Sequence, residues 1–131
     1  MDAGWNKLYE EAMKVLNPRR ISEWVEAGGL GAAVETASGN IYTGVCVDGA
    51  CTLGICAEHN AIFNMITNGE SEIRRVIAVN RDGKAMPSLR GLQGTHDPRI
   101  MAESYGDIEI MLDYESGRTV TLGKLTPEWW I

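Results

Sequence analysis

The chain has 131 residues, of which 44% are hydrophobic and 23% charged, and its formal net charge is −6. This length and composition predict a single globular domain spanning residues 1–131. The negative charge, with no basic stripe, argues against nucleic acid or an anionic membrane as a partner and favours a small molecule. We expect no membrane segment and no secretory signal, because the sequence lacks both a long apolar run and a basic start followed by an apolar one.

The predicted elements begin with a helix over residues 6–16, where apolar side chains recur at helical spacing until Asn17-Pro18. A short helical turn is predicted over 21–26. Residues 30–35 and 41–47 predict the two strands of a β-hairpin, because a turn signal at 38–40 separates them.

The second half of the chain predicts one more helix and three more strands. The helix covers residues 56–67, and the strands cover 75–80, 107–113 and 118–125. Residues 87–104 match neither pattern, and their glycines and prolines oppose a helix, so we expect an irregular segment there. Helices that alternate with strands predict a sheet covered by helices on both faces.

The three cysteines, Cys46, Cys51 and Cys56, all lie within eleven residues. An odd, clustered set is a poor disulfide framework, so we expect a reducing, cytoplasmic environment. For Cys46 and Cys51 we expect the structural role of small buried side chains.

Cys56 and Glu58 are the candidates for chemistry. A cysteine in the first turn of a helix lies in the field of unpaired N–H groups, which favours the metal-binding thiolate. Glu58, two residues on, is placed to carry a proton for a metal-bound water. Taken alone the tripeptide favours an ordinary helix start, because a first-turn Glu commonly complements the helix dipole.

Three segments together are more specific: residues 31–34 (GAAV), 39–44 (GNIYTG) and 56–62 (CAEHNAI). They resemble the cytidine deaminase superfamily, in particular blasticidin S deaminase-like bacterial proteins, and the resemblance covers nearly the whole chain. It implies a three-layer α/β/α sandwich around a five-stranded mixed sheet, assembled as a homotetramer. It also implies a zinc-dependent hydrolase that removes the exocyclic amine of a cytosine-type, nucleoside-like substrate.

The resemblance also implies roles for individual residues. Cys56 would be one zinc ligand and Glu58 the catalytic proton carrier. Ala57 and Asp48 would bind the substrate, Asp48 by accepting a hydrogen bond from a sugar hydroxyl. Cys46 stands where the family has an asparagine for the sugar, so the substrate-binding pattern is matched only in part.

The second half of the zinc motif is missing. The family carries Pro-Cys-x-x-Cys about thirty residues after the first cysteine, but here Pro87 is followed by Ser-Leu-Arg-Gly. Ser88 and Gly91 stand where the two cysteines belong, and neither supplies a thiolate. We therefore expect zinc to be absent or weakly bound and activity to be impaired. The nearby His96 and Asp97 are expected to be solvated, and His59 to be structural.

A frame slip in the coding DNA would account for the loss. One permitted choice of codons for residues 87–97, read one nucleotide later, encodes PPCGACRELM, which is the family motif. The lost ligand positions then correspond to Leu89 and Leu92. We favour a slip near Pro87, restored near Met101, over divergence to a zinc-free protein, and the coding DNA distinguishes the two. Three functions stay open: a damaged deaminase, a zinc-free protein that binds a small ligand, and an oligomeric structural subunit.

Overall fold

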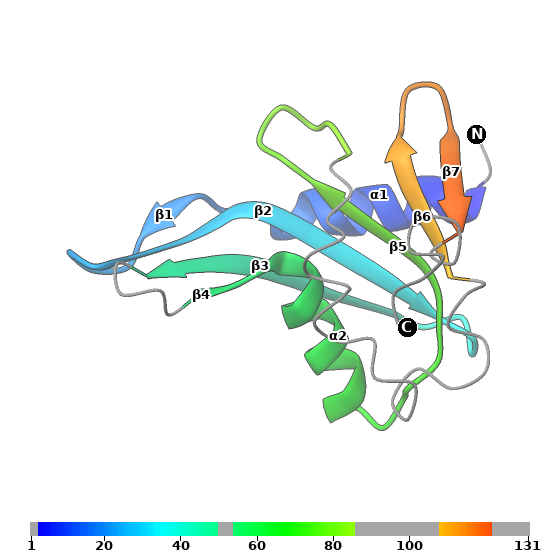
Figure 1. The fold of residues 1–131 in the computed structure, drawn as a ribbon, viewed down its shortest axis with the longest axis horizontal. Helices are drawn as coiled ribbons and strands as arrows, with labels where there is room; N and C mark the ends of the chain where they lie inside the picture. Colours follow the sequence, from blue (N-terminus) through cyan, green and yellow to red (C-terminus); the bar gives the residue numbers. More distant parts are fainter. Residues whose placement is uncertain (1–2, 50–53, 86–107, 122–131) are drawn as a thin grey trace, which may run out of the picture.

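The computed structural model describes residues 3–49, 54–85 and 108–121, and its elements are arranged around one sheet (Figure 1). In chain order they are α1 (Ala3–Val15), β1 (Arg19–Arg20), β2 (Val25–Thr36), β3 (Ile41–Gly49), β4 (Gly54–Ile55), α2 (Ala57–Thr67), β5 (Ile73–Val79), β6 (Glu109–Asp113) and β7 (Arg118–Thr121).

The strands form one mixed sheet in the order β4-β3-β2-β5-β6-β7, with β1 added alongside β2. β5 and β6 pair in parallel and the other neighbours pair antiparallel. The five longer strands are the five predicted from the sequence, while β1 and β4 are additions of two residues each. The expected mixed sheet is therefore confirmed.

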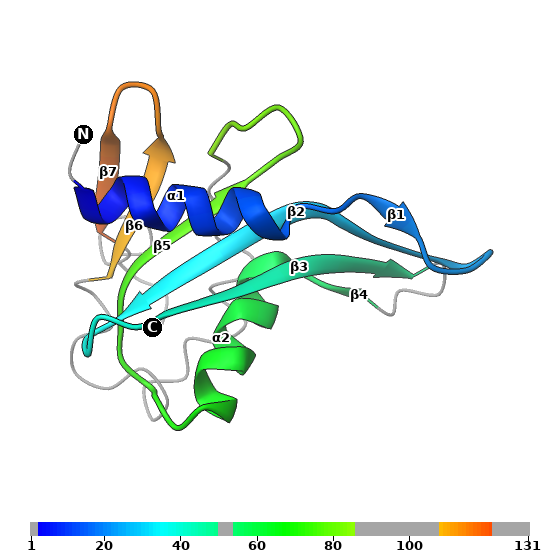
Figure 2. The ribbon, with the colours of Figure 1, turned by 180° about the vertical axis from the view of Figure 1, so that it is seen from behind.

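The two helices cover opposite faces of this sheet, which confirms the three-layer architecture (Figures 1 and 2). Successive residues of a strand point to opposite faces, so β2 sends Ala33 towards α1 and Val34 towards α2. The α1 layer buries Trp5, Leu8, Ala12, Ala33, Ile77, Val79 and Met111. The α2 layer buries Ala32, Val34, Cys46, Ala57, Ala61, Ile62, Met65, Ile73, Val76, Ala78, Ile108 and Ile110.

The short helical turn predicted over residues 21–26 is wrong. Residues 19–20 form β1, and the backbone nitrogens of Ile21 and Ser22 donate to the Val25 carbonyl at 2.8 and 3.1 Å, closing a β1–β2 hairpin. The apolar spacing was misleading because the large side chains at these positions are exposed to solvent. Ile21 and Trp24 are 56% and 66% exposed at the tip of this hairpin.

The β1–β2 hairpin and the adjoining ends of β3 and β4 extend beyond α2, and we call this projection the arm (Figures 1 and 2). It is continuous with the sheet, because residues 25–27 of β2 pair with residues 47–49 of β3. The register between these strands shifts between Ala27 and Gly31, where the arm leaves the body of the sheet.

Residues 87–104, which we expect to be irregular, lie outside the described residues, as do residues 107 and 122–125 of the two predicted terminal strands. No helix in the described part of the chain is long and apolar enough to cross a membrane.

Candidate active site

Cys56 lies at the start of α2, as the sequence predicts. It is the N-cap residue, with extended backbone angles of φ −79° and ψ 159°, and its Sγ accepts a hydrogen bond from the backbone nitrogen of His59 at 3.2 Å. A side-chain acceptor at this position satisfies one of the unpaired N–H groups of the first turn. The cap therefore fixes where the Cys56 sulfur lies relative to the helix.

The start of α2 is held directly on β3. Gly44 makes this approach possible, because a Cβ atom at that position would lie 2.4 Å from the backbone nitrogen of Ala61. The Nδ2 of Asn60 donates to the carbonyl of Val45 at 3.1 Å, and the Nδ2 of Asn64 donates to the carbonyl of Thr43 at 3.2 Å. The helix is thereby anchored by contacts that do not depend on its apolar face alone.

Glu58 is buried within the first turn of α2, with 2% of its surface exposed. A glutamate that only complements the helix dipole is expected in solvent, because burying a carboxylate is costly. The burial of Glu58 therefore favours a functional role over an ordinary helix start. Ala57 is fully buried in the same cluster as Cys46, so its side chain forms part of the core.

The electrostatics of Cys56 differ from the expectation. Burial raises the pKa of the Cys56 thiol and the negative charge of Glu58 adds to the rise, against the lowering effect of backbone hydrogen bonds from His59, Glu58 and Cys56 itself. The N–H groups at the helix terminus act in the expected direction, but desolvation outweighs them and the net effect favours the thiol in the protein alone.

Asp48 is brought near the start of α2 by strand pairing. β4 directly precedes Cys56, and its residues Gly54 and Ile55 pair with Asp48 and Val47 of β3. Asp48 is exposed, and its Oδ2 accepts a hydrogen bond from the Cys46 thiol at 3.6 Å. Cys46 is itself buried and its Sγ accepts from the Leu30 backbone nitrogen at 3.3 Å. The predicted structural role of Cys46 therefore fits its surroundings.

Asp48 lines two adjoining cavities, of about 350 and about 240 Å³. Both also include Gly29 of β2 and Arg81, which follows β5, so three segments of the sheet meet there. Sequence reasoning missed Arg81. The signal available was its position, a charged residue two positions after the end of the buried strand β5.

The described residues do not by themselves make a zinc site. A catalytic zinc takes three protein ligands, and over 3–49, 54–85 and 108–121 no group of three or more His, Cys, Asp or Glu side chains could hold a metal ion. Cys56 is the one described residue for which the sequence resemblance implies a ligand role. The positions expected for the missing ligands, Ser88 and Gly91 or Leu89 and Leu92, lie outside the described residues.

Of the remaining histidine and cysteine predictions, one concerns a described residue and the others do not. His59 stacks on Phe63 with 5.7 Å between ring centroids, and burial lowers the pKa of its imidazole. This packing agrees with the structural role predicted for His59. Cys51, His96 and Asp97 lie outside the described residues.

Comparison with solved structures identifies proteins that share this architecture. The chain is similar to cytidine deaminase from Mycobacterium tuberculosis over 99% of each chain, with 23% identity and a TM-score of 0.75. The enzyme from Mycobacterium leprae matches 97% of this chain and 100% of its own, with 24% identity and a TM-score of 0.74. Cytidine deaminase from Bacillus anthracis matches 98% of this chain and 90% of its own, with 18% identity and a TM-score of 0.67.

These matches define the chain as a protein with the cytidine deaminase fold, as its sequence motifs predict. No family model matches the sequence. The fold is shared over nearly the full length of the compared proteins.

Proposed function

We propose that this chain is a hydrolytic deaminase of the cytidine deaminase type, acting on the exocyclic amine of a cytosine-type nucleoside, and that its activity is impaired. The observation that supports this most strongly is the buried carboxylate of Glu58, two residues after the N-cap Cys56 at the start of a helix anchored on the sheet. A carboxylate that is shielded from water exchanges its proton with a group inside the site.

The impairment follows from the donor set. The chain has only three cysteines, and the Sγ of Cys46 already forms hydrogen bonds with the Leu30 backbone nitrogen and the Asp48 carboxylate. A single thiolate holds zinc weakly compared with three. We therefore expect little or no bound zinc and no measurable deamination of cytidine or blasticidin S by the chain as written.

The test is to rebuild the missing motif. Residues 88–95 are replaced by Pro-Cys-Gly-Ala-Cys-Arg-Glu-Leu, the wording read one nucleotide out of frame. Zinc content, measured by mass spectrometry, is expected to rise to about one per chain, and loss of cytidine absorbance should reveal turnover. In this repaired protein Glu58→Gln should keep the zinc and abolish turnover, while Cys56→Ser should lose the zinc.

Two results would overturn the proposal. One is zinc at full occupancy in the unmodified chain, since that requires ligands other than those named. The other is a folded repaired protein that holds zinc and deaminates no cytosine-type nucleoside. Circular dichroism of each variant separates a folding failure from a catalytic one.

A zinc-free protein that binds a small ligand is the alternative, and the two cavities beside Asp48 favour it over a purely structural subunit. Binding to the folded state alone raises the unfolding temperature in proportion to the logarithm of ligand concentration. A nucleoside that stabilises the unmodified, zinc-free chain therefore supports this alternative, whereas restored turnover in the repaired chain supports the deaminase.

We also propose that the chain assembles with copies of itself, as a tetramer. Two exposed apolar sets support assembly: Ile21 and Trp24 at the tip of the arm, and Phe63 and Ile66 on α2, which are 46% and 42% exposed. Large exposed aromatic side chains on a projecting element are typical of interfaces. Light scattering coupled to size exclusion measures the state, and a monomer at micromolar concentration would refute it.

A further inference from the structure

Two of the chain's cysteines lie opposite each other across neighbouring strands. Val47 pairs with Ile55 in the antiparallel β3–β4 ladder, so the same register one step further sets Cys46 opposite Cys56. The backbone of Cys56 is still extended, with φ −79° and ψ 159°, although this residue caps α2. The strand geometry therefore continues to the cysteine pair.

This register gives the pair the two properties that a disulfide requires. Opposite residues of antiparallel strands have Cα atoms about 4.5–5.5 Å apart and side chains on the same face of the sheet. Disulfides form between cysteines whose Cα atoms are about 4.4–6.8 Å apart. Cys46 is on the α2 face, where it packs in one cluster with Ala57, the residue that follows Cys56.

Both thiols are free, and each now has other partners. The Sγ of Cys46 accepts from the Leu30 backbone nitrogen at 3.3 Å and donates to Asp48 Oδ2 at 3.6 Å. The Sγ of Cys56 accepts from the His59 backbone nitrogen at 3.2 Å. A bridge requires both side chains to turn away from these partners, and α2 then loses its cap. A disulfide that forms at such a cost is readily reduced.

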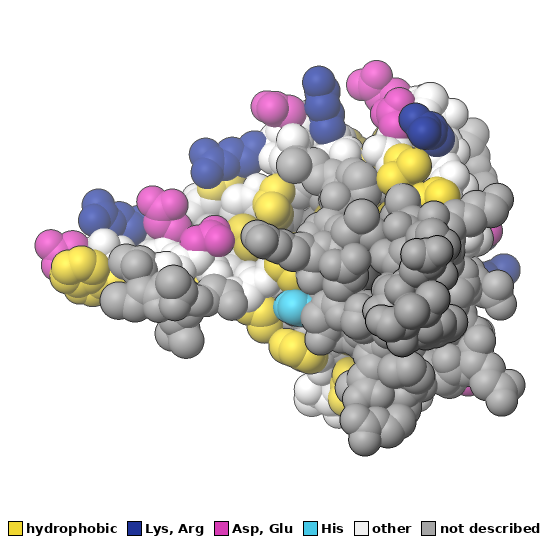
Figure 3. Space-filling view, viewed as in Figure 1, with side chains coloured by type: hydrophobic (Ala, Val, Ile, Leu, Met, Phe, Trp, Pro, Cys, Tyr) yellow, Lys and Arg dark blue, Asp and Glu magenta, His cyan; other side chains and the backbone are white. Residues whose placement is uncertain are grey.

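The two thiols differ in their access to solvent. Cys56 is half-buried, whereas Cys46 is 5% exposed. His59 in the same turn is also half-buried, and Figure 3 shows a histidine side chain reaching the surface among hydrophobic ones. An oxidant from solution therefore reaches Cys56 first, and Cys46 is left to react inside the protein.

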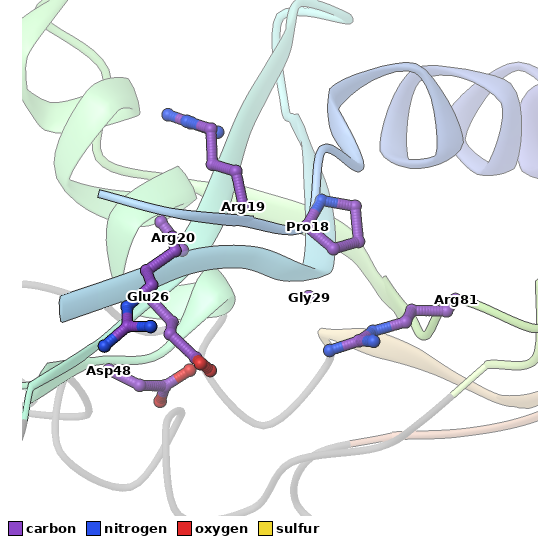
Figure 4. A pocket seen from close by; sticks show the side chains of 8 residues that line it. Pro18, Arg19, Arg20, Glu26, Gly29, Asp48 and Arg81 are labelled. Atoms are coloured by element: carbon purple, nitrogen blue, oxygen red, sulfur yellow. The ribbon is translucent and has the colours of Figure 1, made fainter. Parts of the chain in front are cut away.

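Asp48 supplies a route for the proton of the Cys46 thiol. Its carboxylate already accepts the hydrogen bond from that thiol, and its side chain is exposed where it lines the smaller cavity (Figure 4). The proton can therefore pass from Cys46 to Asp48 and on to solvent. The backbone N–H of Leu30 points at the same sulfur and stabilises negative charge on it.

We propose that Cys46 and Cys56 form a reversible disulfide in exchange with a small disulfide such as oxidised glutathione, and that this bond withdraws Cys56 from metal binding. The bond itself depends only on the geometry of the pair. Its effect on metal rests on the proposed function, in which Cys56 is a zinc ligand. Transient disulfides of this kind occur in reducing compartments.

The reaction has two exchange steps. The Cys56 thiolate attacks one sulfur of oxidised glutathione, which releases the first glutathione as a thiolate and leaves a mixed disulfide on Cys56. Cys46 then gives its proton to Asp48 and attacks the Cys56 sulfur, and the bond to the second glutathione breaks with its electron pair on that leaving group. The two departing thiolates take up the two protons that the cysteines lose. In total, two protein thiols are oxidised and one glutathione disulfide is reduced to two thiols.

The experiment titrates the unmodified chain, freed of metal with a chelator, across ratios of oxidised to reduced glutathione. Burial raises the pKa of the Cys56 thiol and keeps its thiolate fraction low, so the samples are followed over hours. Free thiols should fall from three to one per chain. The intact mass should fall by that of two hydrogens, and excess reduced glutathione should reverse both changes.

Two variants identify the pair. Cys51→Ser is the matched control, because it removes the third thiol and keeps the proposed pair, and its two thiols should both disappear. Cys46→Ser should instead stop at the mixed disulfide, which adds one glutathione to the mass and stays on Cys56. Circular dichroism checks that each variant is folded.

Three results would overturn the proposal. They are two surviving thiols in folded Cys51→Ser at every glutathione ratio, an intramolecular disulfide in Cys46→Ser, and a bond that joins two chains on a non-reducing gel. Since Cys51→Ser keeps both proposed thiols, a folding failure of Cys46→Ser alone leaves a decisive measurement.

The effect on metal is measured in the repaired chain with residues 88–95 rebuilt. Oxidised glutathione should lower its zinc content, and Cys46→Ser in the same background should keep the zinc under the same conditions. If the disulfide forms in the unmodified chain but the repaired chain binds no zinc when reduced, only the proposed function fails. If the repaired chain deaminates cytidine but no Cys46–Cys56 bond forms, only the disulfide fails.

Discussion

Replacing Gly44 by alanine tests whether close contact between α2 and β3 holds the candidate active site. The new Cβ would lie 2.4 Å from the nitrogen of Ala61 and 2.7 Å from the carbonyl carbon of Asn60. Ordinary contact begins at 3.4 Å, so the helix must retreat by about 1 Å. Both neighbouring atoms belong to backbone, which cannot rotate away as a side chain would.

The cost of this retreat has two parts. Overpacking of a well-packed core costs about 1–3 kcal/mol. The two hydrogen bonds from Asn60 and Asn64 to β3 would lengthen, and each contributes about 0.5–1.5 kcal/mol. We expect Gly44→Ala to lower the free energy of unfolding by about 2–6 kcal/mol and the melting temperature by roughly 5–20 °C.

Urea denaturation followed by circular dichroism measures the loss of unfolding free energy. An unchanged slope of that free energy against urea concentration confirms that the same transition is being compared. Gly29→Ala is the matched control, because Gly29 is also a strand glycine and its added Cβ would meet nothing closer than 3.6 Å. The control should change stability by no more than about 1 kcal/mol. If Gly44→Ala is as stable as this control, α2 is not held as described.

Two further outcomes are expected. Glu70 accepts hydrogen bonds from Asn40 Nδ2 at 2.9 Å and Tyr42 Oη at 2.8 Å, and these lower the pKa of its carboxyl to about 2. Because the folded state favours the ionised form, this contribution is present above pH 4.5 and is lost as the pH falls towards 2. The stability difference between the parent and Glu70→Gln should therefore shrink over that range in urea titrations, and a constant difference would contradict it. Trp24→Ser should leave the monomer's stability within about 0.5 kcal/mol while lowering the mass measured by light scattering, and an unchanged mass would place the interface elsewhere.

The sequence predicted elements best where burial and spacing agree. The helix predicted over 56–67 begins one residue later in the structure, and its apolar positions are those that pack on the sheet. The sequence-based prediction failed at residues 21–26. Ile21 and Trp24 are apolar and suitably spaced for a helix, but both are exposed. A local pattern carries no information on what an element packs against.

The residues of the candidate site also separate into those that a local pattern identifies and those that depend on tertiary contacts. Cys56 and Glu58 were identifiable because a short motif fixes them on one helix turn. The burial that raises the pKa of the Cys56 thiol was not identifiable, since it depends on segments distant in the sequence. Arg81 was missed for the same reason, because its relation to Asp48 exists only once β2, β3 and β5 lie side by side.

The parallel pairing of β5 and β6 has a consequence for how such a protein could lose its chemistry and keep its shape. A parallel pair requires a long crossover between the end of one strand and the start of the next, here between Val79 and Glu109. That connection must be long enough to return from the end of β5 to the start of β6. Two compensating shifts of reading frame change the amino-acid residues of a crossover and preserve its length. A frame slip of the proposed kind is therefore compatible with the β5–β6 pairing, and rebuilding residues 88–95 at the same length is expected to preserve the sheet.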